Sequence, residues 1–204
     1  MKNKLGMGLA IATLLVAATA SAAAYWTPWV SEEGGGPETG CSAYNEAANG
    51  SGCSGSYCDN VRLQCTTMPF NASIVPSSVY WSEWTSEENS GLTTYFGGGW
   101  FQYDEDDYHV CHAWNNQPGF ITGMKCSGRY CDKISVECGQ ARASLLRGGA
   151  SYPVGVTDCS WTGWYSEEQG TSINFGANRY ATGVECSGSY CDQKRFFVCS
   201  MVDP

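Results

Sequence analysis

The chain contains one short pattern three times, and this internal repeat constrains the fold more than any other feature. Each copy opens with two tryptophans and a Ser-Glu-Glu; the tryptophans are Trp26 and Trp29, Trp81 and Trp84, and Trp161 and Trp164. Each copy closes with Cys-Ser-Gly-Xaa-Tyr-Cys-Asp, at 53–59, 126–132 and 186–192. One unit of this size buries too little apolar surface to be stable alone. The repeat therefore predicts three structural units, 25–66, 80–139 and 159–200, within one compact domain.

The local residue pattern is that of β-strands. Val61, Leu63 and Cys65 alternate with polar residues, and the same period of two recurs in the segment 134–138. The mature chain shows no good amphipathic helix. We therefore predict an all-β fold of three disulfide-stapled units in a pseudo-threefold, prism- or trefoil-like arrangement, with the paired tryptophans packed into a shared centre. The segments 67–79 and 140–158 are expected to be linkers, and the middle unit carries an insertion near 93–116.

The twelve cysteines divide into four per unit, and their spacing predicts a disulfide framework. The short spacing suits the local bridges Cys53–Cys58, Cys126–Cys131 and Cys186–Cys191. The remaining cysteines would pair as Cys41–Cys65, Cys111–Cys138 and Cys159–Cys199. Each of these longer bridges would contribute about 3–4 kcal/mol. Zinc is the alternative use of clustered cysteines, but an oxidising compartment favours bridges.

The first 24 residues have the features of a Sec-type signal peptide. Lys2 and Lys4 precede a short apolar run, and small residues follow at 20–24. We therefore expect a secreted or periplasmic protein. No other apolar stretch is long enough to predict a membrane span. The formal net charge of −9 argues against nucleic acid as a partner, because an acidic chain repels phosphate.

The insertion in the middle unit is the best candidate for a ligand site. Exposed aromatic rings stack on the apolar face of a sugar, while carboxylate and amide groups bind its hydroxyls. The candidate residues are Trp100, Tyr103, Asp106, Tyr108, Trp114 and Asn115. The alternative is that these aromatic side chains merely pack over an enlarged loop.

The repeated acidic residues suggest a structural role more than a chemical one. Catalysis needs one site, whereas Ser-Glu-Glu and the Asp after each second hairpin cysteine occur in all three copies. We expect these carboxylates to accept backbone N–H groups at turns. Calcium is an alternative ligand for them, and no other cofactor is predicted. His109 and His112, beside the acidic run 104–107, are an alternative zinc site, although regular strand geometry would point them apart.

The layout resembles the dermatopontin type of extracellular protein. Trp161 and Trp164, Gly183-Val184, Asp192 and the segment Phe196–Cys199 occupy places that match that family's repeat. The segments 59–65 and 132–138 match less closely. The chain lacks the family's Asp-Arg-Xaa-Trp segment and has the Cys-Ser-Gly-Xaa-Tyr-Cys hairpin in addition. The resemblance implies an extracellular binding protein with carbohydrate or matrix ligands and no enzymatic activity.

Together these features favour a secreted β-repeat protein that binds a glycan or another surface polymer. Three similar units would provide several weak sites, and multivalency would raise the avidity. An extracellular structural or protein-interaction module is the alternative. A secreted hydrolase or toxin is the third hypothesis, and equivalent residues in three copies argue against the single catalytic centre that it requires.

Overall fold

A computed structural model describes residues 23–32, 38–86, 109–113, 117–144, 150–168 and 172–204 of the chain. The fold is all-β with six disulfides, as predicted, and the described ranges contain no α-helix. No helix among the described residues is long and apolar enough to cross a membrane. All but the last two residues of the predicted signal peptide lie outside these ranges.

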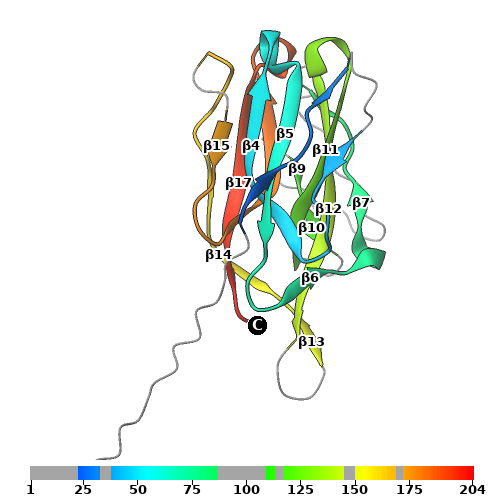
Figure 1. Cartoon of the computed structure of the whole chain (residues 1–204), viewed down its shortest axis with the longest axis vertical. Coiled ribbons are helices and arrows are strands. Elements are labelled where there is room, and N and C mark those ends of the chain that lie inside the picture. Colours follow the sequence, from blue (N-terminus) through cyan, green and yellow to red (C-terminus); the bar gives the residue numbers. More distant parts are fainter. Residues whose placement is uncertain (1–22, 33–37, 87–108, 114–116, 145–149, 169–171) are drawn as a thin grey trace, which may run out of the picture.

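Three long antiparallel hairpins form the framework (Figure 1). Hairpin 1 pairs β4 (Glu46–Ser54) with β5 (Asn60–Thr67), hairpin 2 pairs β11 (Gln117–Ser127) with β12 (Lys133–Ser144), and hairpin 3 pairs β16 (Arg179–Ser187) with β17 (Gln193–Val202). The predicted alternation is confirmed in β5, where Val61, Leu63 and Cys65 are buried and their neighbours are not. The three cysteine-containing turns lie together at one end of the molecule (Figure 1).

Each tryptophan segment lies along the second strand of its own hairpin. β1 (Tyr25–Trp26) and β2 (Val30–Ser31) pair with β5. β7 (Tyr80–Trp81) and β8 (Thr85–Ser86) pair with β12. In the third case β14 (Gly155–Trp161) pairs with β17, and an isolated bridge joins Tyr165 to Lys194.

A second set of short strands crosses from one hairpin to the next. β3 (Thr39–Gly40), which precedes hairpin 1 in the chain, pairs with β11 of hairpin 2. β9 (His109–Val110) pairs with β16 of hairpin 3, and β15 (Ser172–Asn174) pairs with β4 of hairpin 1. Every hairpin therefore receives a strand from the segment that precedes another hairpin, so the three hairpins are linked through backbone hydrogen bonds.

A β-bulge marks the place where each crossing strand arrives. The register shifts at Asn49, Thr122 and Thr182 in the first strand of the three hairpins. The carbonyl groups of these three residues accept hydrogen bonds from the N–H groups of Phe175, Cys41 and Cys111. A glycine follows each bulge. A Cβ on Gly50 would lie 2.8 Å from the carbonyl oxygen of Ile173, so only glycine permits this approach.

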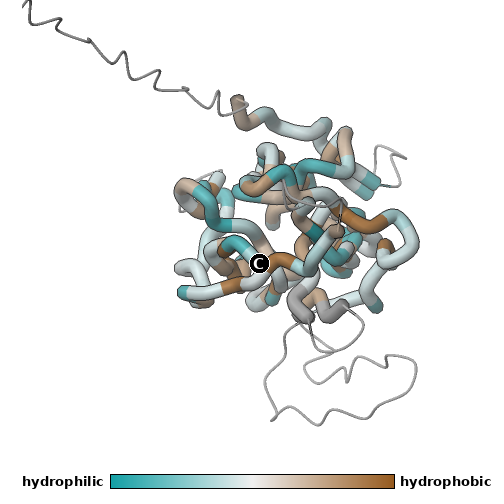
Figure 2. The backbone as a smooth tube through the Cα atoms, turned by 90° about the horizontal axis from the view of Figure 1, so that it is seen from below, coloured by the Kyte–Doolittle hydropathy of each residue, from teal (hydrophilic) through white to brown (hydrophobic). Residues whose placement is uncertain are grey.

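The buried side chains form two clusters. The larger one includes the inward residues of all three hairpins, among them Leu63, Ile121 and Val184. The smaller one lies around Phe120 and Tyr180, whose rings meet edge to face. Hydrophilic and hydrophobic residues follow each other at short intervals along the chain, as expected for strands with one buried face (Figure 2).

The two predicted linkers differ from expectation because both contain strands. β6 (Ala72–Ile74) pairs with β12 and is followed by the 3₁₀ turn η2 (Pro76–Ser78). β13 (Ser151–Pro153) also pairs with β12, which extends to Ser144. Ala72 and Ile74 belong to the smaller core cluster. Short apolar runs without clear periodicity gave no strand signal here, although tertiary pairing makes them strands. β10 (His112–Ala113) forms a further short pair with β11.

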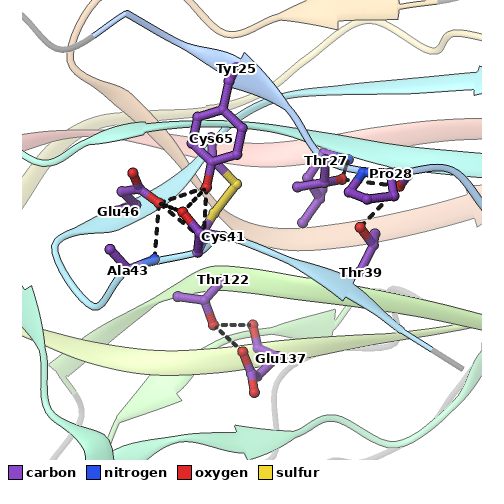
Figure 3. Close-up of a disulfide and its surroundings, with 12 residues drawn as sticks. Tyr25, Thr27, Pro28, Thr39, Cys41, Ala43, Glu46, Cys65, Thr122 and Glu137 are labelled. Atoms are coloured by element: carbon purple, nitrogen blue, oxygen red, sulfur yellow. Dashed lines mark hydrogen bonds between the residues drawn. A yellow bond between two sulfur atoms is a disulfide. The ribbon is translucent and has the colours of Figure 1, made fainter.

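The six disulfides join the pairs expected from the spacing. The local bridges are Cys53–Cys58, Cys126–Cys131 and Cys186–Cys191, and the long ones are Cys41–Cys65, Cys111–Cys138 and Cys159–Cys199. Around the first long bridge, the Tyr25 hydroxyl donates to Glu46, which also accepts the N–H of Ala43 (Figure 3). Six disulfides indicate an oxidising compartment.

Candidate functional site

The ligand site predicted from the sequence lies outside the described residues. Its members fall in 87–108 and 114–116; they are Trp100, Tyr103, Asp106, Tyr108, Trp114 and Asn115. The backbone of His109 and His112 is described, in β9 and β10. The described residues contain two other groups of aromatic side chains, and both groups belong to the repeated motifs.

The prediction that the paired tryptophans pack in the core is wrong. Trp29 and Trp84 are 41% and 36% exposed, and the other four of the set are half-buried. The hydroxyl residue after the first tryptophan explains this orientation. The side-chain oxygens of Thr27, Ser82 and Thr162 accept the backbone N–H of Leu63, Val136 and Phe196. These three hydroxyls point toward the hairpin strands, so the flanking tryptophans lie on the outer surface.

Each pair of tryptophans holds one basic side chain, and we call this arrangement a tryptophan stack. The guanidinium carbon of Arg62 lies 4.3 Å from the ring centroid of Trp26 and 4.1 Å from that of Trp29. The ammonium group of Lys125 lies 4.3 Å from Trp81 and 5.3 Å from Trp84. In the third stack Arg195 lies 4.8 Å from Trp161 and 4.5 Å from Trp164. All six distances are within the range of cation–π attraction.

The basic residue of the second stack comes from a different strand. Arg62 and Arg195 both stand four residues after the last cysteine of the hairpin motif, where the second copy has Ser135. Lys125 is the cross-strand partner of Ser135 and supplies the charge from β11 instead. The basic residues of the first and third stacks could have been found from the sequence, because both stand at the same distance from the hairpin motif. The basic residue of the second stack could not, because the pairing of Lys125 with Ser135 is known only from the fold.

The three stacks differ in exposure and in charge. Arg195 forms an ion pair with Glu185, its cross-strand partner, and both tryptophans of this third stack are half-buried. The cross-strand partner of Arg62 is Gly52. Among the residues that the structure describes, no carboxylate pairs with Arg62 or Lys125. The first and second stacks are therefore the more open ones.

The three hairpin turns form the second aromatic group. The turns η1 (Ser56–Cys58), η4 (Arg129–Cys131) and η5 (Ser189–Cys191) hold their tyrosines in the left-handed backbone region, with φ between 58° and 60°. The rings of Tyr57, Tyr130 and Tyr190 contact one another, with centroids 5.2–5.4 Å apart. We call these three residues the tyrosine cluster. The left-handed conformation is uncommon for tyrosine and costs on the order of 1 kcal/mol at each position.

The turns are fixed by contacts between neighbouring hairpins. The Sγ atom of Cys58 lies 3.2 Å from the carbonyl oxygen of Asp192, and that of Cys131 lies 2.8 Å from the carbonyl oxygen of Asp59. The Sγ atom of Cys191 lies 3.0 Å from the carbonyl oxygen of Asp132. Each turn thus contacts the other two, and these contacts fix the turns that carry the tyrosine cluster relative to one another.

The repeated carboxylates serve these turns. Glu167 of the third Ser-Glu-Glu accepts the backbone N–H of Tyr57 at 2.9 Å, which confirms for this residue the predicted role at a turn. The Asp132 carboxylate fills the space beside Gly128, where a Cβ would lie 1.8 Å from its Oδ1 atom. Cys53, Cys58 and Glu167 place three possible ligand atoms close together, but both sulfurs are in a disulfide, so this group lacks the thiolates that zinc needs.

One lysine is buried near the third turn. Lys194 has no exposed surface and stands where the other copies have Val61 and Ile134. Its ammonium nitrogen donates to the carbonyl oxygen of Cys191 at 2.6 Å. Burial lowers the pKa of Lys194 to about 7, although Asp192 and Glu167 act in the opposite direction. Burial is the main cause that raises the pKa of Asp192, and the negative charge of Glu167 is the second.

No family model, curated protein or solved structure matches the chain. The resemblance to the dermatopontin type of protein therefore stays a prediction.

Proposed function

We propose that this is a secreted, non-enzymatic protein that binds a carbohydrate or another surface polymer through its tryptophan stacks. In this proposal residues 1–24 are the signal peptide, and the three repeat units are arranged around a pseudo-threefold axis, as in a prism. The observation that carries the proposal is the outward orientation of the paired tryptophans, with Trp29 and Trp84 the most exposed of the six.

The chemistry of the stacks suits a sugar. The apolar face of a pyranose ring packs on an exposed indole, and the bound basic side chain keeps the indole rings in a fixed orientation. A single site of this kind is weak. Stacks on three hairpins let a polymer with repeated sugar units engage more than one of them, and avidity then replaces tight single-site binding. The aromatic residues of the middle insertion are a further candidate site in the same proposal.

The proposal includes no catalytic step and no cofactor. The carboxylate of Glu167 is engaged by a backbone N–H, and that of Asp132 packs against its own turn. Calcium is tested as an additive, because carboxylates are numerous in the chain.

A glycan and polysaccharide screen of the oxidised mature protein tests the proposal, with and without calcium. We expect a saturable hit that quenches or shifts tryptophan fluorescence and is weakened at least about fivefold in Trp29→Ala and Trp84→Ala. Tyr152→Ala, which removes an exposed aromatic ring away from the stacks, is the matched control. Binding that persists in both tryptophan variants and is lost in Trp100→Ala would move the site to the insertion. No binding to any sugar by folded, fully bridged protein would contradict the proposal.

The tyrosine cluster favours the second candidate function, a protein-interaction module. Tyrosine, serine and glycine together give rigid contact area at low entropic cost, as in antibody binding loops.

A further inference from the structure

The tyrosine cluster already holds one cation, supplied by the chain itself. The guanidinium carbon of Arg129 lies 4.9 Å from the ring centroid of Tyr130. One guanidinium nitrogen of Arg129 also donates to the Tyr130 hydroxyl at 3.2 Å. An arginine side chain can therefore contact the π face of this ring and donate a hydrogen bond to its hydroxyl group at the same time.

The other two members of the cluster have the same backbone geometry but no such side chain. Ser56 and Ser189 occupy the position that Arg129 has in the second turn. The turns match closely, with φ of 58° at Tyr57 and 60° at Tyr130 and Tyr190. Within the described part of the chain, no cation–π contact involves the ring of Tyr57 or Tyr190, although the charge of Arg129 also interacts with Tyr190. Tyr57 is 41% exposed and Tyr190 is half-buried, so the ring of Tyr57 is the more accessible of the two.

The charge around the cluster also favours a cation. The carboxylate of Glu167 is hydrogen-bonded to the N–H of Tyr57, and its charge contributes to the raised pKa of Asp192 in the neighbouring turn. The whole chain has a net charge of −9, which steers basic partners toward it.

We propose that the tyrosine cluster binds an arginine-containing basic segment of a partner protein, with guanidinium groups placed over Tyr57 and Tyr190 as Arg129 is placed over Tyr130. Arg129 fills the third position, so the site accepts two arginine side chains of the partner. This interaction is separate from polymer binding at the tryptophan stacks and does not depend on it.

Octa-arginine serves as the probe, and its binding to the mature protein is followed by fluorescence anisotropy at physiological salt. Ser56→Arg/Ser189→Arg fills both open positions from within, so its affinity for the probe should fall about tenfold. The second turn carries arginine at this position naturally, so this variant should fold. Arg129→Ser opens the third position and should raise the affinity about threefold. Octa-lysine should bind more weakly than octa-arginine.

A matched variant separates site binding from net charge. Ser151→Arg/Thr157→Arg adds the same two charges on exposed positions of β13 and β14, away from the hairpin turns (Figure 1). It should lose less than about threefold in affinity, because distant surface charges are screened. Equal losses in the two double variants would overturn the proposal, as would no binding of octa-arginine or no shift of the Tyr57 and Tyr190 ring resonances on its addition. Polymer binding should be unchanged in Ser56→Arg/Ser189→Arg.

Discussion

At the residue level, Lys194 is a buried position at which the third copy differs in charge from the other two. The third copy places this lysine where the others bury Val61 and Ile134, and its cross-strand neighbour Tyr165 is also polar. The Tyr165 hydroxyl donates to Ser51 of hairpin 1, and burial raises its pKa. A buried lysine costs stability as long as it is protonated.

This lysine predicts a pH dependence of stability. The pKa of Lys194 is about 7 in the folded state and 10.5 in the unfolded chain, so between these values the unfolded state binds the extra proton. The free energy of unfolding should therefore rise with pH across this window, by about 2 kcal/mol from pH 7 to pH 9. Lys194→Ile, which restores the residue of the second copy, should be more stable at pH 7 and should lose this dependence. Chemical denaturation at several pH values measures both, and parallel pH profiles for the two proteins would refute the assignment.

A second prediction concerns the basic residue of the second tryptophan stack. Lys125→Ser removes the cation and should destabilise the fold by about 0.5–1 kcal/mol. Adding Ser135→Arg places a guanidinium where Arg62 and Arg195 stand in the other hairpins, and it should restore part of this loss, because it also removes the hydrogen bond that the buried Ser135 hydroxyl donates to the Ser82 carbonyl. Denaturant unfolding of the single and double variants gives the comparison. Unchanged stability of Lys125→Ser relative to the wild-type protein would show that the cation does not order Trp81 and Trp84.

At the scale of elements, the hairpin turns depend on their glycines. Gly128 has a φ of +73° and leaves no room for a Cβ beside Asp132. Gly128→Ala should lower the free energy of unfolding by about 1–3 kcal/mol. Gly163→Ala is the control, because a Cβ there meets no atom within 4 Å. Similar effects of the two substitutions on unfolding would show that the turn geometry contributes little.

The hairpins themselves could be predicted from the sequence, whereas the arrangement of the tryptophans could not. Alternation in segments such as 61–65 identifies strands because a strand turns every second side chain inward, and the cysteine spacing identifies the turns. Two tryptophans at fixed positions in every copy predict a packing role in the core. Their orientation is decided by Thr27 and its counterparts, whose hydroxyls bond to the hairpin strand, and by a cation such as Lys125 that comes from another part of the chain. Neither contact has a signal in local periodicity.

At the scale of the whole molecule, the crossing strands make the hairpins interdependent. β3, β9 and β15 each tie one hairpin to the segment that precedes another. The Cys58, Cys131 and Cys191 sulfur contacts do the same at the turns. A repeat that cannot bury its core alone is stabilised in this way by its neighbours. The surface then carries similar tryptophan stacks on separate hairpins, which is the basis of the proposed multivalent binding.

Multivalent binding through the tryptophan stacks is tested most sharply by calorimetric titration, which gives the number of binding sites per chain for a short, monovalent form of the sugar found in the screen. We expect more than one site per chain. Trp29→Ala and Trp84→Ala should each remove one site and leave the others unchanged, because the stacks lie on different hairpins. A single site per chain that survives both substitutions would contradict multivalent binding through the tryptophan stacks.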